Sequence, residues 1–148
     1  MSDPSSIVRE IMIEADNATV FAFFTDAERL IRWMGTSANL DAKPGGLLLI
    51  DVQPGSRARG EFKEVVPVSH LAYTWGWEGK DNVPPGSTRI EIDLSAQNGH
   101  TLLRFSHHGL PPEEIQPHTE GWKHYLSRLA MAASGKNPGP DTRPPRSQ

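Results

Sequence analysis

The sequence predicts an α+β fold in which a curved antiparallel sheet of about six or seven strands is wrapped on one long C-terminal helix. Two observations carry this prediction. Over residues 37–108 apolar and polar side chains alternate with period two, and turn residues interrupt the alternation at short intervals, which is typical of consecutive hairpins. Over residues 118–133 the large side chains instead recur every three or four residues, which is the spacing of one helix face.

Ahead of the sheet region, the chain predicts one strand and two short helices. Ile7–Ile13 alternates well enough for a first strand. Asp16 can cap a helix with an apolar side, and Asp26 can cap a second helix that runs to Met34. Gly35 then ends this helical part of the chain.

The remaining strands are separated by turns that have a physical cause. In residues 43–46 and 53–56 proline and glycine fix the backbone angles of a turn, and the Asn-Gly pair at 98–99 is the best hairpin signal in the chain. The predicted strands are residues 38–41, 47–52, 58–66, 71–77, 88–94 and 101–107. Paired in this order, they give a sheet with one apolar face for the last helix to cover.

The long helix has a predicted beginning and a predicted end. Pro117 fits its first turn, where the missing N–H costs nothing, and Gly135 fits its C-terminal stop. Residues 135–148 contain four prolines, two glycines and no large apolar side chain, so we expect them to be disordered. Residues 1–6 are small and polar, and we expect a loose terminus there.

Composition limits the classes of function. The 148 residues fit one domain, and no apolar run approaches the roughly 20 residues of a membrane helix. The N-terminus lacks a secretion signal, so the expected location is cytoplasmic. The chain has no cysteine, which excludes disulfides, thiolate nucleophiles and cysteine-ligated zinc. A net charge of -3 without a Lys/Arg block argues against nucleic acid as a partner.

Several motifs follow one another from Ile7 to Ala133, nearly the whole domain. They are the segments 21–33, Asp41 with 43–46, 60–67, 71–75 and 101–109, and then His118, 121–122, 125–126 and 129–130. Together they resemble the START-like (SRPBCC) superfamily, and more narrowly the subfamily named for the C-terminal domain of the activator of Hsp-ninety ATPase. The resemblance implies a helix-grip fold over residues 7–134, with a cavity between the curved sheet and the long helix.

Aromatic side chains gather on the elements that we expect to face each other. They either line a cavity for a small hydrophobic or aromatic ligand or fill the space as solid core. The residues that we expect to line such a cavity are Trp33, Met34, Trp75, Trp77, Phe105, His107, His118, Trp122 and Tyr125. The sequence does not identify the ligand.

Two of these candidates, His107 and His118, have either a catalytic or a structural role. A histidine there is either an acid–base group or a structural side chain bonded to a backbone group or to Glu120. The six histidines show no metal-binding spacing, so we expect no metal and no cofactor. The acids near the short helices suit caps and solvated charges, and no nucleophile elbow or phosphate loop is present. No catalytic residue is assigned.

Three functions compete at this point. The first is a ligand-binding protein; the second is a cyclase- or hydrolase-like enzyme that uses the same cavity with a histidine as its acid–base group. The third, a chaperone-interaction module, rests on the subfamily name alone, and we do not expect a chaperone contact. No residue argues for a role in the stress response. An open sheet edge makes a homodimer possible.

Overall fold

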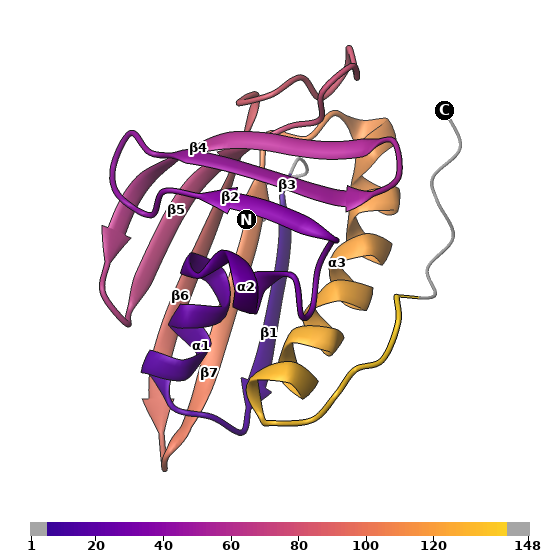
Figure 1. Ribbon diagram of the computed structural model, residues 1–148. Coiled ribbons are helices and arrows are strands. Elements are labelled where there is room, and N and C mark those ends of the chain that lie inside the picture. The colour runs from indigo at the N-terminus through magenta and orange to yellow at the C-terminus, as the bar shows by residue number, and fades with distance from the viewer. Residues whose placement is uncertain (1–5, 142–148) are drawn as a thin grey trace.

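One antiparallel sheet of seven strands frames the molecule (Figure 1). The structure is a computed structural model and describes residues 6–141. The strands are β1 (Ile7–Ile13), β2 (Ser37–Leu40), β3 (Leu47–Gln53), β4 (Ser56–Val66), β5 (His70–Trp75), β6 (Thr88–Gln97) and β7 (His100–His108). Their order in the sheet is β1-β7-β6-β5-β4-β3-β2. Successive strands therefore pair as hairpins from β2 to β7, and β1 closes the other edge. This confirms the predicted helix-grip fold.

In the β6–β7 hairpin, the period-two alternation of apolar and polar side chains places the apolar side chains on one buried face. Ile90 lies opposite His107 and Ile92 lies opposite Phe105, and these four side chains are buried on one face. Between the strands, the Asn-Gly pair at 98–99 has positive φ angles of 54° and 83°. That is the geometry of a type I′ turn, which matches the twist of the flanking strands. The predicted hairpin is confirmed.

β5 is shorter than the sequence predicts, because it ends at Trp75 rather than at Trp77. Gly76 explains the ending. A Cβ at this position would lie 1.8 Å from the carbonyl oxygen of Pro84, so only glycine lets the following loop, residues 76–87, fold back this closely. Trp77 leaves the strand and keeps one isolated bridge to Ala58.

The two short helices are α1 (Asn17–Thr25) and α2 (Ala27–Leu30). Both predicted caps are confirmed: Asp16 accepts a bond from the backbone N–H of Thr19, and Asp26 accepts one from that of Glu28. The second helix is shorter than predicted, since residues 31–34 form turns. There the buried Trp33 turns back toward α1 and donates from Nε1 to the carbonyl of Phe23 at 2.9 Å.

The long helix, α3 (Pro112–Ala133), begins five residues earlier than predicted. Pro112 occupies the first turn and Pro117 lies inside the helix, so the prediction for Pro117 was wrong. The missing N–H of Pro117 would have bonded the carbonyl of Glu113, and Glu113 is exposed, so that carbonyl can bond water instead. At the other end, Gly135 has a φ of +91°, as a C-terminal stop requires.

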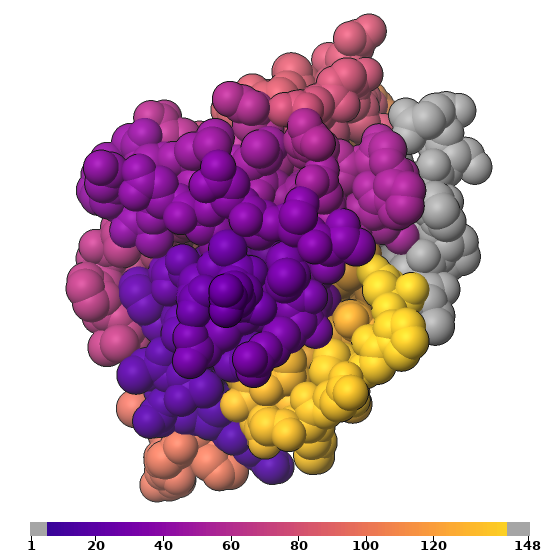
Figure 2. All heavy atoms as spheres, in the orientation of Figure 1, coloured from indigo at the N-terminus to yellow at the C-terminus, as the bar shows by residue number. Residues whose placement is uncertain are grey.

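α3 meets the α1–α2 region on one side of the molecule. The guanidinium of Arg128 donates to the carbonyl of Trp33 at 3.1 Å, and Figure 2 shows the end of the chain's described part beside the α1–α2 region. Residues 135–141 return along α3, where the Tyr125 hydroxyl donates to the Asp141 carboxylate at 2.6 Å. The expected disorder of the tail stays a prediction for residues 142–148, which lie outside the described residues, as do residues 1–5.

No helix within residues 6–141 is both long enough and apolar enough to span a membrane.

Candidate functional site

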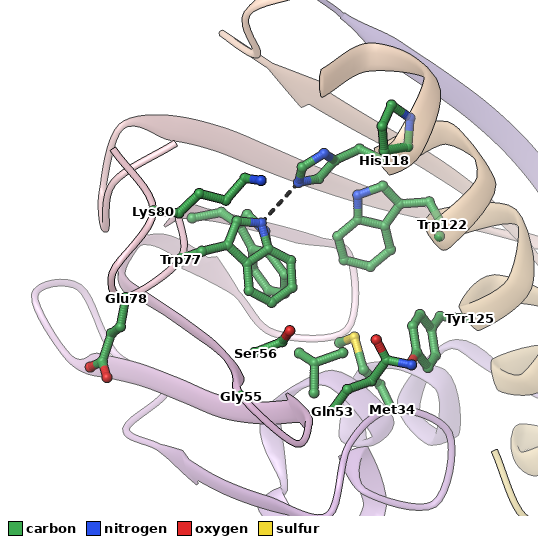
Figure 3. Close-up of a pocket in the computed structure, with 14 residues that line it drawn as sticks. Met34, Gln53, Gly55, Ser56, Trp77, Glu78, Lys80, His118, Trp122 and Tyr125 are labelled. Atoms are coloured by element: carbon green, nitrogen blue, oxygen red, sulfur yellow. Dashed lines mark hydrogen bonds between the residues drawn. The ribbon is translucent and has the colours of Figure 1, made fainter. Parts of the chain in front are cut away.

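A pocket lies between α3, the β3–β4 turn and the loop that follows β5 (Figure 3). Its volume is about 60 Å³. Because each buried water needs roughly 10–15 Å³ of such space, the pocket has room for about four waters. It is lined by Met34, Val52, Gln53, Gly55, Ser56, Trp75, Trp77, Glu78, Lys80, Pro117, His118, Gly121, Trp122 and Tyr125. The pocket lies beside the first half of α3, and side chains leave little open space in it.

The structure brings together most of the residues predicted to line a cavity. The wall includes Met34, Trp75, Trp77, His118, Trp122 and Tyr125. Phe105 lies behind the wall, with its ring centre 4.6 Å from that of Trp122. His107 and Trp33 are fully buried and lie outside the lining. Ligand binding by the nine predicted residues stays a prediction.

Other lining residues were missed. Pro117 and Gly121 precede Tyr125 by eight and four positions, so the three share one side of α3. This spacing could have been noticed, because small or flat residues in line with an aromatic leave space on a helix face. Gln53 is the last residue of β3, Ser56 is the first residue of β4, and Lys80 comes from the loop after β5. No local pattern in the sequence marks these residues.

Behind the pocket wall, Trp122 and His107 form a buried pair. Nε1 of Trp122 donates to Nδ1 of His107 at 3.0 Å. An indole nitrogen can only donate, so Nδ1 carries no proton and Nε2–H donates to the Thr88 hydroxyl at 2.8 Å. The hydroxyl then donates to the carbonyl of Trp75 at 2.8 Å. These bonds fix His107 as one neutral tautomer.

Burial also favours the neutral form of His107, because it lowers the pKa of the side chain. Desolvation is the main reason that the pKa of His107 lies well below its usual value of 6.5. Nearby His118 and His108 lower the pKa further, since a positive charge on either would repel a second one. His107 therefore stays uncharged at neutral pH.

At the pocket wall, Trp77 and His118 form a second pair of the same kind. Nε1 of Trp77 donates to Nε2 of His118 at 2.9 Å, which Figure 3 shows as a dashed line. By the same reasoning Nδ1 of His118 carries the proton, and it donates to the backbone carbonyl of Glu114 at 2.9 Å. A structural partner was one of the two alternatives for His118, and that partner is the backbone of Glu114 rather than Glu120.

The carboxylate of Glu114 connects the loop after β5 to the first turns of α3. Glu114 is only 4% exposed. Its Oε2 lies 3.0 Å from Nζ of Lys80 and 3.1 Å from Nδ2 of Asn82, and its Oε1 lies 3.2 Å from Nδ1 of His118. Paired in this way, a buried carboxylate can hold the loop, and with it Trp77, over the pocket.

The charges around the pocket are balanced. Lys80 is paired with Glu114, and Glu78 lies 3.6 Å from Arg57 and 3.3 Å from Arg59. Across residues 6–141, no three His, Asp or Glu side chains come together in a group that could hold a metal ion. The pocket therefore offers aromatic walls and a few hydrogen-bonding groups rather than an excess of charge.

Comparisons with known proteins agree with this architecture. The family model described as "Activator of Hsp90 ATPase homolog 1-like protein" matches residues 14–134. An AHSA1-like protein of Rhizobium etli has a solution structure at 50% identity and a TM-score of 0.75, covering 97% of this chain and 90% of that one. CalU16 from Micromonospora echinospora is similar at 27% identity and a TM-score of 0.73, covering 91% and 69%.

A dimeric Aha1 from Colwellia psychrerythraea shares the fold, at 16% identity and a TM-score of 0.78, with 88% of this chain and 96% of that one covered. A search of curated proteins found no match. The family model covers most of the chain, and its boundaries include α1, the sheet from β2 to β7 and α3. The chain belongs to the family of Activator of Hsp90 ATPase homolog 1-like proteins.

Proposed function

We propose that this protein binds a small hydrophobic or aromatic molecule in the pocket between the sheet and α3. The observation that carries the proposal is the wall itself, in which Trp75, Trp77, Trp122 and Tyr125 meet a few polar groups. Small-molecule sites usually combine a mostly apolar wall with a few placed polar groups. Such a wall excludes water from a flat apolar ligand and gains free energy from its burial.

The size of the pocket limits the ligand. At about 60 Å³, the pocket has less than half the volume of a cavity that holds one benzene ring, which is roughly 150 Å³. A single aromatic ring with a short substituent therefore needs more room than this, and an outward shift of Trp77, in the loop after β5, can supply it. A long acyl chain would have to displace side chains such as Trp122, which packs against Phe105.

The histidines support binding better than acid–base catalysis. Both ring nitrogens of His107 are engaged with protein groups, and the side chain is fully buried. Nε2 of His118, the nitrogen nearer the pocket, accepts the bond from Trp77. A general base needs a nitrogen that can reach its substrate. For His118 to act as an acid–base group in an enzyme, its bond from Trp77 would first have to break. The possible homodimer and the expected lack of a chaperone contact both stay predictions.

Binding can be tested by filling the pocket from the helix. Gly121 lines the pocket, so Gly121→Leu places a branched side chain beside it. We expect single-ring aromatic probes to bind the wild type saturably and to bind Gly121→Leu at least about tenfold more weakly, because one lost ring contact of this size is worth more than about 1.4 kcal/mol. NMR titration of the tryptophan indole resonances measures both affinities.

The matched control is Glu120→Leu, which adds the same side chain to an exposed position of α3. This variant should bind the probes as the wild type does. The proposal is wrong if no probe binds saturably, or if Gly121→Leu and Glu120→Leu bind equally well.

A further inference from the structure

One polar group in the pocket wall has no partner in the described part of the chain. The protein has four tryptophans. The indole N–H groups of Trp33, Trp77 and Trp122 donate to Phe23, His118 and His107, respectively. Nε1 of Trp75 is buried and has no hydrogen-bond acceptor among residues 6–141, although the side chain is only 1% exposed. The indole N–H of Trp75 is thus an unsatisfied donor in a residue that lines the pocket.

A buried N–H without an acceptor is costly and rare. The indole ring of Trp75 is surrounded by other rings, with the centre of Trp122 at 5.2 Å and that of Trp77 at 5.4 Å. Those neighbours offer only ring faces, which are weak acceptors, and their own N–H groups are donors, so they leave Trp75 without a full hydrogen bond. Trp75 lines the pocket and its Nε1 is covered, so an acceptor in the pocket reaches Nε1 when a neighbouring ring such as that of Trp77 shifts.

The electrostatics of the pocket show which acceptor suits this donor. Lys80 is already paired with Glu114, and the carboxylate of Glu78 is paired with two arginines. An anionic ligand would therefore give up its hydration without gaining an unpaired cation. A neutral acceptor, such as a carbonyl oxygen, avoids that loss.

Ser56 adds a second polar group at the same place. It is the first residue of β4, and Figure 3 shows its hydroxyl pointing toward the space between Trp77 and Trp122. A hydroxyl can donate or accept, so it suits the same oxygen or a neighbouring polar atom. The remaining wall is aromatic, and it favours a flat ring beside this polar end.

We propose that the ligand is a neutral single-ring aromatic molecule whose carbonyl-type oxygen accepts a hydrogen bond from Nε1 of Trp75. This inference rests on the proposed function, since it specifies the ligand class of the same pocket. It assigns Trp75 as the residue that selects for an acceptor, with Trp77 and Trp122 contacting the ring.

The test uses two probes of the same shape, acetophenone and α-methylstyrene, in which a CH2 group replaces the carbonyl oxygen. We expect acetophenone to bind about tenfold more tightly, the preference that one hydrogen bond supplies. The indole proton of Trp75 should move downfield with acetophenone and not with α-methylstyrene, since accepting a bond deshields the proton. Benzoate, which adds a charge, should bind more weakly than acetophenone.

Trp75→Phe removes the donor and keeps an aromatic ring, so acetophenone and α-methylstyrene should then bind equally. Trp77→Phe also removes an indole N–H from the wall, but it should keep the preference for acetophenone. The disappearance of one indole resonance in Trp75→Phe assigns the signal. If Trp75→Phe fails to fold, the probe preference and the resonance shifts of the wild type still decide.

The outcomes separate this inference from the proposed function. Equal binding of acetophenone and α-methylstyrene to the wild type, with an unmoved Trp75 resonance, overturns the acceptor proposal and leaves ligand binding intact. Tighter binding of benzoate than of acetophenone overturns the neutral class. If none of the three probes binds, the proposed function fails and this inference fails with it.

Discussion

Two indole–imidazole pairs in this protein make the same bond in different surroundings. In the buried pair, Trp122 donates to His107 at 3.0 Å, and both side chains come from regular elements, α3 and β7. In the pair at the pocket, Trp77 donates to His118 at 2.9 Å. Trp77 belongs to the loop after β5 rather than to a strand, and it is only partly buried.

The difference shows that the environment decides what such a bond does. The buried bond belongs to a chain that continues through Thr88 to the backbone of Trp75, so no member can turn away without leaving a buried polar group unsatisfied. The bond at the pocket joins a loop to a helix, and the indole of Trp77 can exchange its partner for water. We infer that the first pair stabilises the fold and that the second closes the pocket.

The largest expected effect comes from removing each imidazole in turn. His107→Phe leaves the Trp122 N–H buried without an acceptor and breaks the bond to Thr88, so we expect a loss of about 3 kcal/mol in the free energy of unfolding. His118→Phe should cost about 1 kcal/mol, because Trp77 can bond water. Urea denaturation measures both losses. His100→Phe, at an exposed position, is the control; equal losses for His107→Phe and His118→Phe would contradict the distinction.

Acid should weaken the buried pair next. The pKa of His107 is lowered in the folded protein. Between that lowered pKa and about 6.5, His107 is therefore protonated in the unfolded chain and unprotonated in the folded protein. His107 thus contributes a fall of up to about 1.4 kcal/mol in unfolding free energy per unit of pH below about 6.5. The stability advantage of the wild type over His107→Phe should shrink in this range. A constant difference from pH 7 to pH 5 would show that His107 titrates normally.

The smallest effect concerns the pair at the pocket. Trp77→Phe removes one partly exposed N–H donor and should cost about 0.5–1.5 kcal/mol, less than the corresponding change at Trp122. In the wild type, the indole N–H of Trp77 should exchange with deuterium at least tenfold faster than that of Trp122, because its opening needs only local movement. NMR resolves the two signals. Exchange of Trp77 as slow as that of Trp122 would mean that the pocket does not open at this pair.

Much of the fold followed from local patterns. The period-two alternation and the Asn-Gly turn at 98–99 located the hairpin of β6 and β7, and the motif resemblance supplied the helix-grip arrangement. The start of α3 could not be located, because both Pro112 and Pro117 suit a first turn. What distinguishes them is tertiary: Glu114 has to be helical to reach Lys80 and His118.

The site was less predictable than the fold. Facing aromatics such as Trp75 and Trp122 could be assigned to the same region because strand and helix periodicity fix their faces. Lys80 and Ser56 could not, since the paths of their loops depend on sheet curvature and on the close approach of Gly76 to Pro84. Nor does the sequence show which histidine contacts the pocket. His107 is fully buried behind the pocket wall and His118 is part of that wall, a difference that depends on tertiary packing.

The pairing of β1 with β7 has a consequence for how the chain acquires its structure in time. Ile7 lies opposite His107, so the first strand of this sheet along the chain can pair only after the last strand is present. The hairpins from β2 to β7 join neighbours and can form early, whereas closing such a long loop is slow. We expect β1 to add late during folding, after β7 has left the ribosome, and the edge of β7 to be exposed to other chains until then.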